Sequence, residues 1–121
     1  MAMNEFEIQR DLYKRFKIEY PDMIPCFQAS LNGVNLSAFG KSKFAMINAL
    51  KSNGMCVGQS DIFIAAPRHN FCGKYIELKT RTGKPTQAQL DFGDKMLEMG
   101  YAFEIAKGYD AGWAAIKSYL C

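Results

Sequence analysis

The stretch GQSDIFIAAPRHNFCGKYIELKTRTGKPTQAQ, residues 58–89, decides how this chain is organised. Asp61 opens the apolar run DIFIAA, and the segment ELK follows at 77–79 in a second strand-like run. The turn residues of RHNFCG between the two runs predict that they pair as a hairpin. Because side chains alternate between the two faces of a strand, Glu77 and Lys79 fall on the same face.

The remaining sequence predicts helices and strands around this hairpin. Capping residues and apolar spacing predict four helices, which run from Asn4 to about residue 17, over 42–53, from Thr86 to about 99, and from a cap at Asp110 to the end. Two further strands are expected, at 24–30 and 101–107, with a loop over 31–42. The order α-β-α-β-β-α-β-α predicts an α/β domain with a small mixed sheet flanked by helices.

Length and composition favour one packed domain over residues 1–121. The hydrophobic share of 49% and the charged share of 22% are ordinary for a globular protein. No apolar run approaches the ~20 residues of a membrane span, and the N-terminus lacks a signal pattern, so we expect an intracellular protein. None of the four cysteines stands in a CxxC pair, which favours reduced thiols over a zinc site.

The distribution of charge favours a polyanionic partner more than the net charge of +3 does. Residues 23–60 contain no acid, and residues 68–84 contain five basic residues against one acid. An ordinary solvated surface is the alternative interpretation. If the partner is DNA, the candidate phosphate contacts are Arg68, Lys74, Arg81 and Lys84, with Lys41 and Lys43 as more distant ones. No segment resembles a base-reading recognition helix, so strict sequence specificity is not expected.

The acids and the lysine of the central stretch are the groups that metal-dependent phosphodiester hydrolysis needs. Asp61 and Glu77 can supply two carboxylates and Leu78 a backbone carbonyl, which suit Mg²⁺ or Mn²⁺. Lys79 can orient the attacking water and offset negative charge on the phosphate. Taken singly, Asp61 could be a turn residue, and Glu77 with Lys79 an exposed ion pair that contributes little stability.

Together these residues carry a family resemblance. The pattern G-x-x-D, then E-x-K, then G-x-x-[ST]-x-x-Q before a helix resembles the VRR-NUC nucleases of the PD-(D/E)xK superfamily. The matching segments are GQSD at 58–61, ELK at 77–79 and GKPTQAQ at 83–89, with EIQ at 7–9 in the first helix. The resemblance covers nearly the whole chain. It implies a restriction-endonuclease-like core and a stand-alone VRR-NUC domain of phage or bacterial type.

The resemblance also implies roles by position. Asp61 and Glu77 match the metal-binding acids and Lys79 the catalytic lysine, while Gln89 and Glu7 match a glutamine and a glutamate near the active site. Glu7 stands three residues after a potential cap, so a capping box is its alternative, and Gln89 could bind backbone at a helix start. The family commonly has proline before the aspartate, where this chain has Ser60.

These observations predict a Mg²⁺- or Mn²⁺-dependent DNA endonuclease without an organic cofactor or a membrane partner. The resemblance implies cutting of branched DNA in the manner of a Holliday-junction resolvase, and two symmetric cuts imply a homodimer. It also implies a phage- or prophage-encoded protein in the cytoplasm of a bacterial cell. The alternatives are a flap or nicking nuclease on branched or single-stranded DNA, a non-catalytic nucleic-acid-binding module, and an interaction protein without nucleic acid.

Overall fold

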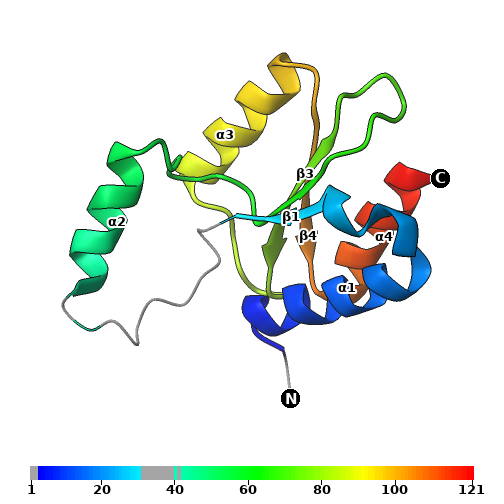
Figure 1. The fold of residues 1–121 in the computed structure, drawn as a ribbon, viewed down its shortest axis with the longest axis horizontal. Helices are drawn as coiled ribbons and strands as arrows, with labels where there is room; N and C mark the ends of the chain where they lie inside the picture. The colour runs from blue at the N-terminus through cyan, green and yellow to red at the C-terminus, as the bar shows by residue number, and fades with distance from the viewer. Residues whose placement is uncertain (1–2, 31–39, 41) are drawn as a thin grey trace.

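The computed structural model describes residues 3–30, 40 and 42–121. Its elements are α1 (Glu5–Glu19), η1 (Pro21–Cys26), β1 (Phe27–Ala29), α2 (Ser42–Ser52), β2 (Ile62–Ile64), β3 (Lys74–Lys79), α3 (Gln87–Glu98), β4 (Ala102–Lys107) and α4 (Tyr109–Leu120). This order confirms the predicted one, with the 3₁₀ helix η1 added before β1 (Figure 1). The loop expected over 31–42 lies almost entirely outside the described residues.

The four strands form one mixed sheet in the order β1-β2-β3-β4. The first three strands are antiparallel neighbours, as a hairpin between β2 and β3 requires. β3 and β4 are parallel because α3 carries the chain back to the starting edge. The mixed sheet flanked by helices that the sequence predicted is therefore confirmed.

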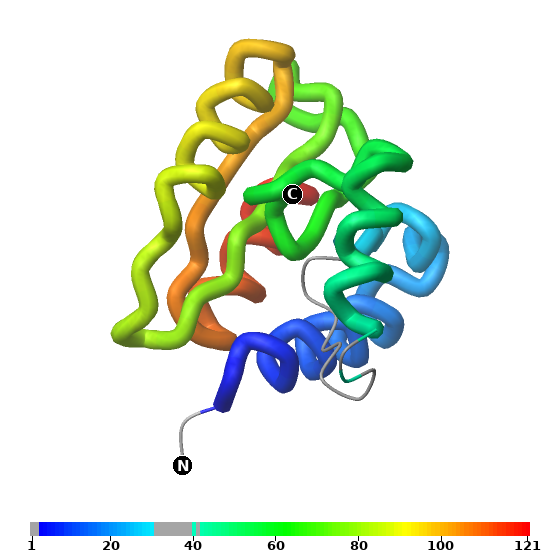
Figure 2. The backbone as a smooth tube through the Cα atoms, turned by 90° about the vertical axis from the view of Figure 1, so that its left-hand side faces the viewer, coloured from blue at the N-terminus to red at the C-terminus, as the bar shows by residue number. Residues whose placement is uncertain are grey.

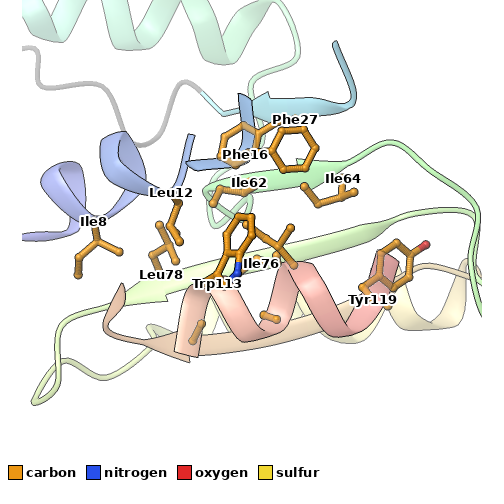
Figure 3. Packing of buried hydrophobic residues seen from close by; sticks show 14 of the residues in the cluster. Ile8, Leu12, Phe16, Phe27, Ile62, Ile64, Ile76, Leu78, Trp113 and Tyr119 are labelled. Carbon is orange, nitrogen blue, oxygen red and sulfur yellow. The ribbon is translucent and has the colours of Figure 1, made fainter. Parts of the chain in front are cut away.

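The core lies between the sheet and the pair α1 and α4 (Figure 3). Ile8, Leu12 and Phe16 form one buried stripe of α1, as their spacing predicts. They meet the buried side chains of β2 and β3 together with Trp113 and Ile116 of α4. This packing fixes the position of the start of α1 relative to β3.

Helix α3 covers the other face of the sheet, as Figure 2 shows from the side. Gly93 allows this close approach, because a Cβ atom there would lie 2.4 Å from the Phe103 ring of β4. Tyr75 of β3 packs edge-on against Phe92, with ring centroids 5.1 Å apart. Helix α2 has no buried residue and projects away from the sheet in Figure 1.

Two of the predicted N-terminal helix caps are confirmed, and a third is wrong. Asn4 caps α1 and Thr86 caps α3, each in a reciprocal capping box. The expected cap at Asp110 is wrong, because α4 begins at Tyr109 and the cap position falls two residues earlier, at Gly108, which has φ +91° and makes no side-chain hydrogen bond. Asp110 instead lies in the first helical turn, where its negative charge interacts favourably with the positive end of the helix dipole. None of the described helices is long and apolar enough to cross a membrane.

Candidate metal site

Strand pairing brings Asp61 and Glu77 together. Ile62 of β2 is the register partner of Ile76 of β3, and the two strands are antiparallel. Asp61, just before Ile62, therefore lies beside Glu77, just after Ile76. Asp61 Oδ2 accepts a hydrogen bond of 2.7 Å from the backbone N–H of Leu78. This bond fixes the carboxylate of Asp61 against β3, and both acids are buried, with 9% and 1% of their surface exposed.

A third carboxylate comes from the first turn of α1. One oxygen from each of Glu5, Asp61 and Glu77 lies within 4.8 Å of the other two. Among the described residues this is the group of acids whose geometry suits a metal ion. The sequence predicted Asp61, Glu77 and the carbonyl of Leu78 as metal ligands, with Glu7 and not Glu5 as a further acid near the site.

Glu7 is not part of this cluster, and its side chain instead completes the capping box of α1. Its Oε1 accepts from the Asn4 backbone N–H at 3.3 Å, and its own N–H donates to Asn4 Oδ1 at 2.8 Å. The sequence contained this information, since Asn followed three residues later by Glu is the capping pattern. Glu5, at the first helical position, is the residue that sequence reasoning missed.

Lys79 lies next to the acids as the alternation of β3 predicts. Its Nζ is 3.5 Å from Glu77 Oε2, and its side chain is 9% exposed. The other oxygen of Glu77, Oε1, is buried without a hydrogen-bond partner among the described residues. A buried oxygen that protein donors leave unbound beside two other carboxylates fits the hard-oxygen ligand set of Mg²⁺ or Mn²⁺.

The electrostatics of the cluster favour a bound cation. Burial, followed by repulsion from Asp61, raises the pKa of Glu77 to about 8, and the ammonium of Lys79 lowers this pKa in part. Burial also raises the pKa of Asp61, opposed by the hydrogen bond from Leu78 and by Lys79. One ammonium therefore does not offset three neighbouring carboxylates, and a divalent cation would.

Gly58, which opens the G-x-x-D segment, lets the chain before Asp61 pass close to helix α3. Its φ of +88° lies in the left-handed region, and a Cβ there would be 2.4 Å from the carbonyl oxygen of Ala88. The segment before β2 thus lies directly on the first turn of α3. Gln89 lies in that turn and lines the same cavity of about 350 Å³ as Glu5, Asp61 and Glu77.

The side chain of Gln89 is used locally in the capping box of α3. Its Oε1 accepts from the Thr86 backbone N–H at 2.8 Å, and its backbone N–H donates to Thr86 Oγ1 at 3.2 Å. The alternative raised from the sequence, that Gln89 binds backbone at a helix start, is what the structure contains. The residue also lines the cavity of the acids, so a contact with substrate remains compatible with its position.

The predicted DNA-binding residues lie in different parts of the fold. Arg81 and Lys84 are exposed in the turn between β3 and α3, beside the end of β3 that carries Lys79. Arg68 lies in the hairpin at the opposite end of β3, where its guanidinium donates to the Pro67 carbonyl. Lys43 lies on α2 with Nζ 5.2 Å from the Phe44 ring, and Lys41 is outside the described residues.

The assignment of Lys74 to DNA binding is wrong. Its Nζ bonds Glu104 Oε1 at 2.7 Å and the Ala115 carbonyl at 3.0 Å, with 8% of the side chain exposed. Lys74 has the opposite parity on β3 to Lys79, so it points to the face that α4 covers. It is a buried structural cation.

Comparison with known proteins gives a likeness at the level of the fold. No protein-family model matches the chain, and no curated protein sequence matches it either. Among solved structures, the chain is similar to a VRR_NUC domain protein, with 21% sequence identity and a TM-score of 0.82. The alignment covers 99% of this chain and 90% of that one. The chain therefore has the fold of that VRR_NUC domain protein, as the sequence resemblance predicted.

Proposed function

We propose that the chain is a single VRR-NUC-type nuclease domain that hydrolyses DNA phosphodiester bonds with Mg²⁺ or Mn²⁺. The observation that carries this proposal is the buried, unpartnered Oε1 of Glu77 beside two other carboxylates and the ammonium of Lys79. The fold likeness and the D…ExK spacing support it independently.

The residues divide the chemistry between them. Glu5, Asp61 and Glu77 would hold the ion, together with the carbonyl of Leu78. A divalent ion held there supplies Lewis acidity for the phosphate and makes water a better nucleophile. Lys79 orients the attacking water and stabilises negative charge that develops on the phosphate. Arg81 and Lys84 hold the flanking phosphates, because they are exposed beside the site.

The substrate that we propose is branched DNA, cut symmetrically by a homodimer as in Holliday-junction resolution. This finer assignment rests on the sequence resemblance and on two-fold symmetry, because one domain of this size has one set of acids. A flap or nicking nuclease is the alternative. The expected setting is the cytoplasm of a bacterial cell, with a phage or prophage gene.

Cleavage of labelled DNA tests the activity. Wild type should cut in Mg²⁺ or Mn²⁺ and not in EDTA, and Lys79→Ala should lower the rate at least about a hundredfold. Asp61→Asn should weaken metal binding while circular dichroism shows an intact fold. If both variants cut as well as wild type, the proposal is wrong. DNA binding without cleavage under any metal would favour the non-catalytic module.

A panel of substrates and a sedimentation experiment test the finer assignment. A four-way junction, a flap, a linear duplex and a single strand should be compared at equal concentration. Preference for the junction with paired cuts supports resolution, whereas preference for the flap or the single strand supports the alternative. Sedimentation that shows only monomer at micromolar concentration, with and without DNA, would exclude the proposed homodimer.

A further inference from the structure

A second, smaller cavity adjoins the cavity of the acids on the same side of the sheet. It has a volume of about 240 Å³. The polar residues that line it are Ser30, Ser60, Gln28 and Gln59, and the aromatic ones are Phe63 and Tyr75. The cavity of the acids shares one wall with it, because Gln59 lines both. A DNA strand whose phosphate lies on the acids therefore has its neighbouring nucleotide beside this second cavity.

Two hydroxyls of this cavity have no hydrogen-bond partner within the part of the chain that the structure describes. Ser60 is 2% exposed, and its Oγ has no hydrogen-bond partner among the described residues. The Oγ of Ser30 is also buried and has no hydrogen-bond partner among these residues. Buried polar atoms are normally hydrogen-bonded, and leaving one unsatisfied lowers stability, so two in one cavity point to a ligand. Ser60 is also where this chain departs from the proline common in the family that it resembles.

The lining chemistry indicates what kind of ligand fits. None of the seven lining residues is charged, so the cavity is not built for a phosphate. Hydroxyls and carboxamides offer both donors and acceptors, as the edge of a nucleobase requires. Phe63 and Tyr75 also line the cavity, with ring centroids 4.4 Å apart, and aromatic rings stack on bases of any sequence.

The size of the cavity restricts the ligand further. Pockets for drug-sized ligands begin at roughly 300 Å³, so a cavity of about 240 Å³ suits one heterocycle and not a base pair. A base whose hydrogen-bonding edge faces the protein cannot at the same time be paired. Occupation of this cavity therefore requires an unpaired base.

We propose that this cavity binds one unpaired nucleobase of the DNA strand that is cut, through Ser60 and Ser30 and over Tyr75. The inference rests on the proposed nuclease function and refines its substrate, because it requires an unpaired nucleotide beside the scissile phosphate. The flexible point of a junction, a flap or a single strand supplies such a nucleotide, and an uninterrupted duplex does not without base flipping.

The variants that test the site are Ser60→Ala and Gln28→Ala, with Ser118→Ala as the matched control. Ser118 is an exposed serine on α4, far along the chain from the cavity. Removing an unsatisfied hydroxyl should leave the melting temperature unchanged or raise it. Gln28 is exposed, and its Nε2 makes a long contact of 3.4 Å to the Pro25 carbonyl, so its removal should not unfold the protein.

The measurement compares two forms of one cleavable DNA, intact and with an abasic site next to the cut. On intact DNA, each cavity variant should lower kcat/KM roughly twofold to tenfold, the range for a neutral hydrogen bond. On abasic DNA, kcat/KM of wild type should fall at least as far as the substitutions lower it on intact DNA. The variants should then have the same kcat/KM as wild type. Anisotropy of the same DNAs in EDTA should show the same pattern in the affinity, independently of cutting.

Three results would overturn the inference. The first is a Ser60→Ala variant that cuts intact DNA as fast as wild type. The second is an equal loss on intact and abasic DNA, which indicates a general structural role. The third is a melting temperature lowered by several degrees, which shows that the hydroxyl is satisfied in solution. If wild type neither binds nor cuts any DNA, the proposed function fails and this inference fails with it.

Discussion

Raising the pH should destabilise the metal-free protein, and the buried carboxyl of Glu77 should be the main cause. Its pKa is about 8 in the folded chain against an ordinary value of 4.5. Between these two values the folded state binds more protons than the unfolded state. The linkage relation then requires the free energy of unfolding to fall as the pH rises through that window.

The size of the effect follows from the same two values. The difference between 4.5 and about 8, at ~1.4 kcal/mol per pKa unit, sets an upper bound of about 5 kcal/mol. The charge of Glu77 is coupled to Asp61 and is partly offset by Lys79, so a loss of a few kcal/mol is expected. For a domain of this size that is a large fraction of the total stability.

Urea unfolding in EDTA at a series of pH values measures this loss for wild type, Glu77→Gln and Glu98→Gln. The amide variant should show a flatter profile and should exceed wild type above about pH 7, because it has no carboxyl to ionise. Glu98 is an exposed acid that pairs with Lys95 on α3, so its variant should follow wild type. A wild-type stability that stays level or rises between about pH 5 and about pH 8 would refute the reasoning.

Three further outcomes follow from the structure. Glu5→Gln should weaken Mn²⁺ binding, whereas Glu7→Gln should leave it unchanged because glutamine also completes a capping box; circular dichroism and a metal titration distinguish them. Gly58→Ala should lower stability by roughly 1–3 kcal/mol and slow cleavage, since the added methyl meets backbone of α3, whereas Gly54→Ala, with φ +104° and open space, should lose less and cut normally. Lys74→Ala should destabilise the fold by ~1–3 kcal/mol in urea unfolding, because the buried Ala115 carbonyl loses its donor, and should not change the salt dependence of DNA binding.

The sequence predicted the fold because local and long-range signals agreed. Hydrophobic spacing, the caps at Asn4 and Thr86 and the turn between two apolar runs each pointed to the same elements. The failure at Asp110 is local, because a glycine with positive φ can start a helix without a side-chain cap. Helix limits were otherwise within one or two residues of the prediction.

The candidate site was predictable where strand alternation decides it and not where tertiary packing does. The parity of β3 places Glu77 and Lys79 on one face, and the same parity should have excluded Lys74. The choice between Glu5 and Glu7 depends on how α1 is rotated against β3, which the buried stripe of α1 sets. The cavity lined by Ser30 and Ser60 joins residues from β1, β2 and β3 and from the segments next to β1 and β2, and no spacing in the sequence indicates it.

Calorimetric titration with Mn²⁺ tests the central claim most directly, because it requires neither DNA nor turnover. Wild type should bind the ion and release protons on binding, since metal displaces the proton that burial favours on Glu77. Glu77→Gln should lose this binding, and Lys79→Ala should retain it. Absence of binding to wild type at millimolar Mn²⁺, or equal binding to wild type and Glu77→Gln, would contradict the account.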